Sequence, residues 1–197
     1  MLVFVKEKLV LLAVPKTGTT ALHAALAPRA GIVMRDPPEL KHTPLRRYKR
    51  YIAPMVEHDD VPLQTLAVLR HPVDWLGSWY RYRHRDKLVG QPNSTRDISF
   101  DDFVSEYVKG KPAAYAAIGA QARFVKNAAG EVGVDHLFQY ENQPGLRGFL
   151  EERLSVKLDL PQRNVSPKME LSLSAPIRAK LERKCAAEFE IWETARR

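Results

Sequence analysis

The feature that most constrains the fold is a pattern that occurs twice: a short apolar run, a charged residue, and a segment with helical spacing. In the first copy, Leu9–Val14 leads through PKTGTT into TTALHAALA. In the second, QTLAVL at 64–69 leads through Arg70 into a segment that begins at Pro72. Such runs are typical of buried strands, and strands that alternate with helices are typical of a parallel sheet with helices on both faces. The pattern predicts an α/β domain.

Other segments complete the expected order of elements. We expect further strands at Leu2–Val5 and His136–Tyr140, and helices at Gln143–Leu154 and from Ser174 to about Arg196. Thr43 is predicted to cap the start of another helix, with Pro44 at its first position. Since no repeat or linker divides the chain, residues 1–197 are predicted to form a single domain.

The composition is that of a globular chain with anionic partners. Apolar residues make up 45% and charged residues 27%, while the net charge is +8. The densest basic runs are LRRYKR at 45–50 and RYRHRDK at 81–87, and an anionic ligand, nucleic acid or a membrane surface could bind them. The lone Cys185 is typical of a reducing compartment. Because charges at 6–8 interrupt the apolar N-terminus, we expect no membrane span and a cytoplasmic location.

The first strand-to-helix turn has the residue types of an anion cradle. Gly18 allows close backbone approach, Lys16 adds a positive charge, and Thr17, Thr19 and Thr20 add hydroxyl donors at a helix N-terminus. A tight turn whose threonines only cap the helix is the alternative. The Walker sequence needs a lysine directly after its second glycine, and here the lysine precedes the glycine. A standard Mg-ATP site is therefore disfavoured, and no metal site is expected.

The second turn places Arg70 at the end of its strand and Ser78 about two helical turns further on. An arginine fork and a hydroxyl suit a second phosphate. The alternative is that Arg70 pairs with a carboxylate such as that of Asp74, while Ser78 only packs. Because the carboxyl ends of parallel strands share one edge of a sheet, Arg70 and Lys16 are expected at the same edge.

Together these stretches resemble the sulfotransferases that use 3′-phosphoadenosine 5′-phosphosulfate (PAPS). VPKTGTT resembles the family's 5′-phosphosulfate loop and VLRHPVDWLGSWY its 3′-phosphate segment, with weaker likenesses in LFQYEN and RNVSPK. The resemblance implies a P-loop-like fold without Mg²⁺ and an in-line transfer of the sulfuryl group to a hydroxyl or amine. It implies that Lys16 neutralises the transferring group, that Gly18, Thr19 and Thr20 hold the 5′ end, and that Arg70 and Ser78 hold the 3′-phosphate.

The sequence does not decide which residue removes the proton from the acceptor. The family uses a glutamate or a histidine. His42 is the first candidate here because an imidazole with a reference pKa of about 6.5 accepts a proton at neutral pH. Glu39 and Asp36 lie in the same segment and remain alternatives.

Several other assignments are also open. Trp75, Trp79 and Tyr80 could stack on adenine or belong to the core. Asn164, Ser166 and Lys168 could close over the nucleotide. The acceptor could be a saccharide with acidic groups or another small molecule. A nucleotide-dependent phosphotransferase with an atypical P-loop and a non-enzymatic polyanion-binding module are the competing functions; no recognition-helix sequence supports nucleic-acid binding.

Overall fold

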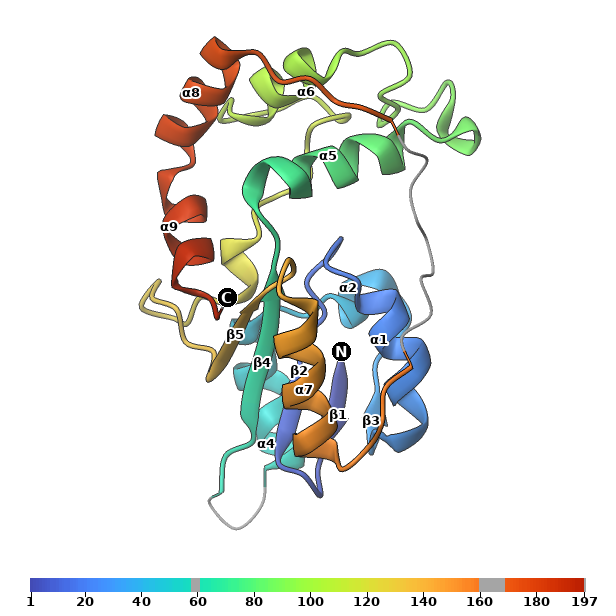
Figure 1. Cartoon of the computed structure of the whole chain (residues 1–197), viewed down its shortest axis with the longest axis vertical. Helices are drawn as coiled ribbons and strands as arrows, with labels where there is room; N and C mark the ends of the chain where they lie inside the picture. The colour runs from blue at the N-terminus through green and yellow to red at the C-terminus, as the bar shows by residue number, and fades with distance from the viewer. Residues whose placement is uncertain (58–60, 160–168, 197) are drawn as a thin grey trace.

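A computed structural model describes residues 1–57, 61–159 and 169–196. Within these residues a five-stranded sheet has the order β3-β1-β2-β4-β5 (Figure 1). The strands are β1 (Leu2–Phe4), β2 (Leu9–Leu11), β3 (Ile32–Val33), β4 (Gln64–Leu69) and β5 (His136–Gln139). Strands β2, β4 and β5 pair in parallel, whereas β1 pairs antiparallel with both β2 and β3. The sheet is mixed, and its parallel part carries the two strand-to-helix turns.

Strand β2 is shorter than expected. The predicted run Leu9–Val14 is buried throughout, but the strand ends at Leu11. The Leu12 amide still donates to the Leu66 carbonyl at 2.8 Å, after which the chain leaves the ladder and enters the loop at 15–18.

Helices cover both faces of the sheet, as predicted (Figure 1). One face packs on α1 (Thr19–Leu26) and α7 (Gln143–Leu154) through leucines of both helices. The other face packs on the segment α3 (Leu45–Arg47), η2 (Tyr48–Ile52) and α4 (Ala53–Val56), on η4 (Ala122–Phe124), and on α9 (Ala186–Thr194). The short α2 (Pro38–Lys41), η1 (Ala27–Arg29) and η3 (Asp86–Leu88) complete the connections.

A third hydrophobic cluster lies beyond the carboxyl end of β4. It joins α5 (Pro72–Arg83), α6 (Phe100–Tyr107) and α8 (Ala175–Lys184) around Trp75 and Phe103. In Figure 1, α5 crosses above the end of β4, with α6 and α8 above it. Helix α6 is capped at its N-terminus, where the Ser99 hydroxyl accepts a hydrogen bond from the Asp102 amide. The cluster covers the edge of the sheet at which the two strand-to-helix turns meet.

Two predictions about helices were also wrong. The Thr43 hydroxyl donates to the Leu40 carbonyl at 2.7 Å and so closes α2, which leaves the extended Pro44 as the N-cap of α3. The predicted C-terminal helix is two helices, because Cys185 has a non-helical ψ of 27°. The break lets Leu181 pack in the third cluster while Ile191 packs against the sheet. No helix in the described ranges combines the length and apolar character needed to cross a bilayer.

Candidate functional site

The loop between β2 and α1 has the backbone shape of an anion cradle. Lys16 and Gly18 both have positive φ, 67° and 76°, and Gly18 is the N-cap of α1. The first amides of the helix therefore have no intrahelical acceptor. The buried Thr17 hydroxyl donates to the Val14 carbonyl at 2.9 Å, so this threonine fixes the turn. The lysine, the first helix amides and the exposed Thr20 are the groups of this loop that can donate to an anion.

Helix α5 is anchored to this loop. The indole Nε1–H of Trp75 donates to the Pro15 carbonyl at 2.9 Å, and the Trp75 side chain is 2% exposed. Tyr80 is 6% exposed, and its hydroxyl donates to the Ile98 carbonyl at 2.6 Å. Both aromatic residues are therefore core residues rather than surfaces for adenine. Trp79 is only partly buried, and its Nε1 is buried without a hydrogen-bond partner among the described residues.

Lys16 lies in an electropositive aromatic cluster. Its Nζ is 4.3 Å from the Tyr82 ring centroid and 5.6 Å from that of Trp79. Burial, followed by the charges of Arg85 and Arg70, lowers the pKa of Lys16 to about 8. Within the part of the chain that the structure describes, no carboxylate forms an ion pair with any of these three cations. A bound anion would relieve this repulsion.

Arg70 joins the ends of two strands to the loop. Its guanidinium carbon is 4.7 Å from the ring centroid of Tyr140, the residue after β5. A Cβ built on Gly18 would come within 3.1 Å of the same ring. Gln121 holds the Arg70 backbone on both sides, accepting from its amide at 2.9 Å and donating to its carbonyl at 2.8 Å. The structure therefore places Arg70 beside the loop, as expected. The Arg70 Nε is buried and has no partner in the described residues.

Ser78 lies on the face of α5 that is turned toward the loop. It is three residues after Trp75 and four before Tyr82, and these two side chains contact Pro15 and Lys16. Ser78 is buried, and the hydrogen bonds found in the described ranges do not include its hydroxyl. The Ser78 hydroxyl can therefore donate a hydrogen bond to an anion held between α5 and the loop.

His42 is hydrogen-bonded to the chain just before the loop. Its Nδ1 lies 2.6 Å from the Ala13 carbonyl oxygen, just before the loop. Since a carbonyl only accepts, Nδ1 carries the proton and Nε2 keeps a lone pair. Burial is the main cause that lowers the pKa of His42 below its usual value, which favours the neutral ring. The alternatives Glu39 and Asp36 are both exposed, and neither side chain makes a comparable contact in the described structure.

Some residues expected at the site are not among those that the structure describes, and two residues near the loop were not assigned a role from sequence. Asn164, Ser166 and Lys168 are outside the described residues. Sequence reasoning did not assign roles to Tyr82 or Gln121. Tyr82 could have been noticed from its helical spacing to Ser78, whereas nothing in the local sequence marks Gln121.

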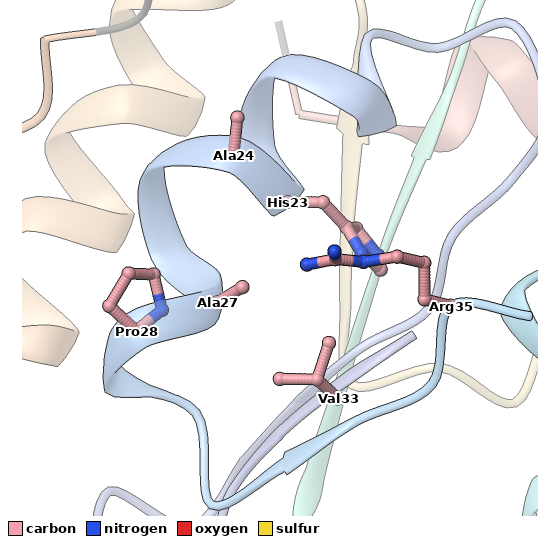
Figure 2. A pocket seen from close by; sticks show the side chains of 6 residues that line it. All are labelled: His23, Ala24, Ala27, Pro28, Val33 and Arg35. Carbon is pink, nitrogen blue, oxygen red and sulfur yellow. The ribbon is translucent and has the colours of Figure 1, made fainter.

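A separate hollow of about 590 Å³ opens between α1, η1 and β3 (Figure 2). His23 and Arg35 extend toward each other across it, and Ala27, Pro28 and Val33 form apolar walls. Burial lowers the pKa of His23 to about 4, and its Nε2 lies 3.2 Å from the Met1 amino nitrogen. His23 is thus a neutral buried residue of α1, and the hollow includes none of the residues expected to bind a ligand.

No family model, curated protein or solved structure matches this chain. Over residues 1–57, 61–159 and 169–196, no group of three or more His, Cys, Asp or Glu side chains could hold a metal ion.

Proposed function

We propose that the protein is a sulfotransferase of P-loop-like fold that transfers the sulfuryl group of PAPS to a hydroxyl or amine. The observation that carries this proposal is the meeting of two strand-to-helix turns around Lys16 and Arg70, without a neutralising carboxylate in the described residues. Two separate cationic turns at one sheet edge suit a ligand with two anionic groups, which is the charge pattern of this donor.

The residues fit the donor in two parts. The amides of Gly18, Thr19 and Thr20 at the start of α1, together with the Lys16 side chain of the same loop, suit the 5′-phosphosulfate. Arg70 and Ser78, which flank the loop from β4 and α5, suit the 3′-phosphate. Trp79 is the one aromatic residue of the three considered for adenine that is not in the core interior.

The transfer asks the protein mainly for positioning and charge compensation. The acceptor oxygen or nitrogen bonds to sulfur as the bond between sulfur and the bridging phosphate oxygen breaks. His42 Nε2 receives the acceptor proton, and the Lys16 ammonium compensates the charge on the leaving phosphate oxygen. The products are a sulfate ester or sulfamate and adenosine 3′,5′-bisphosphate.

Basic side chains next to Lys16 favour an anionic acceptor, such as a saccharide with acidic groups. Arg85 and Lys87 lie 4.8 and 5.9 Å from the Tyr82 ring centroid on which Lys16 also rests. The proposal places the reaction in the cytoplasm, in keeping with the single free thiol of Cys185.

Thermal unfolding with and without adenosine 3′,5′-bisphosphate tests the proposal. At about 100 times its dissociation constant, a ligand stabilises by about 2.7 kcal/mol, and each kcal/mol raises the melting temperature by roughly 2–4 °C at this size. We expect a rise of several degrees that Lys16→Ala and Arg70→Ala reduce, and none with Mg-ATP. A larger rise with Mg-ATP would instead indicate the phosphotransferase, and no rise with the bisphosphate would contradict the sulfotransferase.

A further inference from the structure

The basic run at 45–50 is outside the candidate site and lies on a continuous helical segment. The segment comprises α3, η2 and α4, from Leu45 to Val56. Its inner side is fixed in the core, because Leu45 and Tyr48 are at most 1% exposed and Ala53 and Val56 at most 6%. The Tyr48 hydroxyl also donates to the Glu57 carboxylate at 2.9 Å. Since this inner side is committed to the core, with Ile52 also packed against it, the exposed side chains of the segment point away from the sheet.

The outer side combines positive charge with large apolar side chains. Arg46, Arg47 and Arg50 are exposed, and the described residues provide no ion pair for any of them. Met55 is 73% exposed and Tyr51 is 58% exposed, the two highest values among the exposed large apolar residues of the described chain. We call these five residues the outer face. The Arg50 guanidinium lies 5.1 Å from the Tyr51 ring centroid, so the charged and apolar parts are contiguous.

We propose that the outer face docks the protein on a membrane surface rich in anionic phospholipids. Arginines at this position would pair with lipid phosphates, while Tyr51 and Met55 would enter the boundary between headgroups and acyl chains. Charge alone would suit nucleic acid or a sulfated polysaccharide equally well. Met55 favours the membrane among these partners. Burying its exposed thioether side chain among acyl chains is favourable, whereas a polar polymer offers it little apolar surface to contact.

The docking is expected to be reversible and sensitive to salt. Each basic residue near an anionic membrane strengthens binding by roughly five-fold, so reversing three of them should weaken it by more than roughly a hundred-fold. The core side of the segment is untouched by such changes, so the fold should persist. The proposal does not depend on the sulfotransferase assignment, because the outer face shares no residue with the candidate site.

The test is co-sedimentation of the full chain with vesicles of phosphatidylcholine, with and without phosphatidylserine. We expect binding only to the vesicles that contain phosphatidylserine, and its loss in the triple variant Arg46→Glu, Arg47→Glu, Arg50→Glu. The matched control is Arg123→Glu, Arg183→Glu, Lys184→Glu, which changes the net charge equally at exposed positions elsewhere and should still bind. Circular dichroism and a melting curve on each variant establish that it is folded.

A second variant, Met55→Ser with Tyr51→Ser, separates a membrane from a polyanion. It should bind vesicles more weakly while leaving any binding to heparin or duplex DNA unchanged. The proposal is overturned if both triple variants lose vesicle binding equally, since this would mean that only net charge matters. It is also overturned if the serine variant binds vesicles as the wild type does, or if the wild type shows no preference for phosphatidylserine.

Discussion

Among single residues, the candidate site depends most on Lys16, which is partly buried and, in the described part of the chain, has aromatic rings rather than carboxylates around its ammonium group. The Tyr82 and Trp79 rings lie within 6 Å of the Lys16 ammonium, while Arg70 and Arg85 oppose its charge. A ring face attracts a cation without neutralising it, as a carboxylate would. The Lys16 ammonium therefore remains available to an anion. Its pKa is lowered, because burial and the two arginine charges are not offset by a carboxylate of the described residues.

Replacing Tyr82 tests this arrangement. Tyr82→Leu removes the ring and should weaken binding of adenosine 3′,5′-bisphosphate by roughly two- to ten-fold. Tyr82→Phe is the matched control, since it keeps the ring and should bind nearly as the wild type does. Calorimetric titration measures both. Equal losses in the two variants would point to the hydroxyl instead, and no loss in Tyr82→Leu would mean that the ring does not support Lys16.

The low pKa of Lys16 also predicts proton uptake on binding. The free lysine loses its proton as the pH rises through about 8, whereas a bound anion favours the charged form. Binding near pH 8 should therefore take up protons, and affinity should fall as the pH rises further. Titrations in buffers of different ionisation enthalpy measure this uptake. It should be absent at pH 6, where the free lysine is already charged, and absent in Lys16→Ala at pH 8; uptake that persists in that variant would contradict the assignment.

At the scale of elements, the turn from β2 into α1 decides the shape of the loop. Gly18 combines a left-handed φ with a close approach to Tyr140, and both disfavour a side chain at this position. This turn and the one after β4 could be predicted from sequence, because apolar runs, Gly18 and Pro72 are local signals. The end of α2 could not be predicted from sequence. The Thr43 hydroxyl could bond to the end of α2 or cap the next helix, and the surrounding fold determines which of the two occurs.

A pair of glycine substitutions checks the role of this turn. Gly18→Ala should lower the free energy of unfolding by about 1–2 kcal/mol through its left-handed backbone, with a further loss from the contact with Tyr140. Gly148→Ala is the control in the interior of α7, where a Cβ meets no atom within 4 Å. It should raise the stability by about 0.5–1 kcal/mol. Urea unfolding measures both, and a neutral Gly18→Ala would mean that the loop is not held as described.

At the scale of the whole molecule, the site is built where three parts of the chain meet. The sheet supplies the strand ends, the loop supplies Lys16, and the third cluster holds α5 above them. The sequence predicted four of the five strands and helices on both faces of the sheet, but it predicted neither β3 nor the packing of α5, α6 and α8 over the sheet edge. The hydrogen bonds that hold the residues of this region link positions far apart in the sequence, such as Arg70 and Gln121, which are 51 residues apart. No local periodicity marks such pairs, so they become visible only in the structure.

In the proposed function, the two turns bind two anionic groups of one ligand. The most direct measurement compares the affinities of adenosine 3′,5′-bisphosphate and adenosine 5′-monophosphate by calorimetry, on the wild type, on Arg70→Ala and on the exposed control Arg123→Ala. A charge-assisted contact to the 3′-phosphate should give the wild type and the control a preference of roughly ten-fold or more for the bisphosphate, which Arg70→Ala abolishes. Equal affinities in the wild type, or a preference that survives in Arg70→Ala, would contradict the assignment of the 3′-phosphate to Arg70.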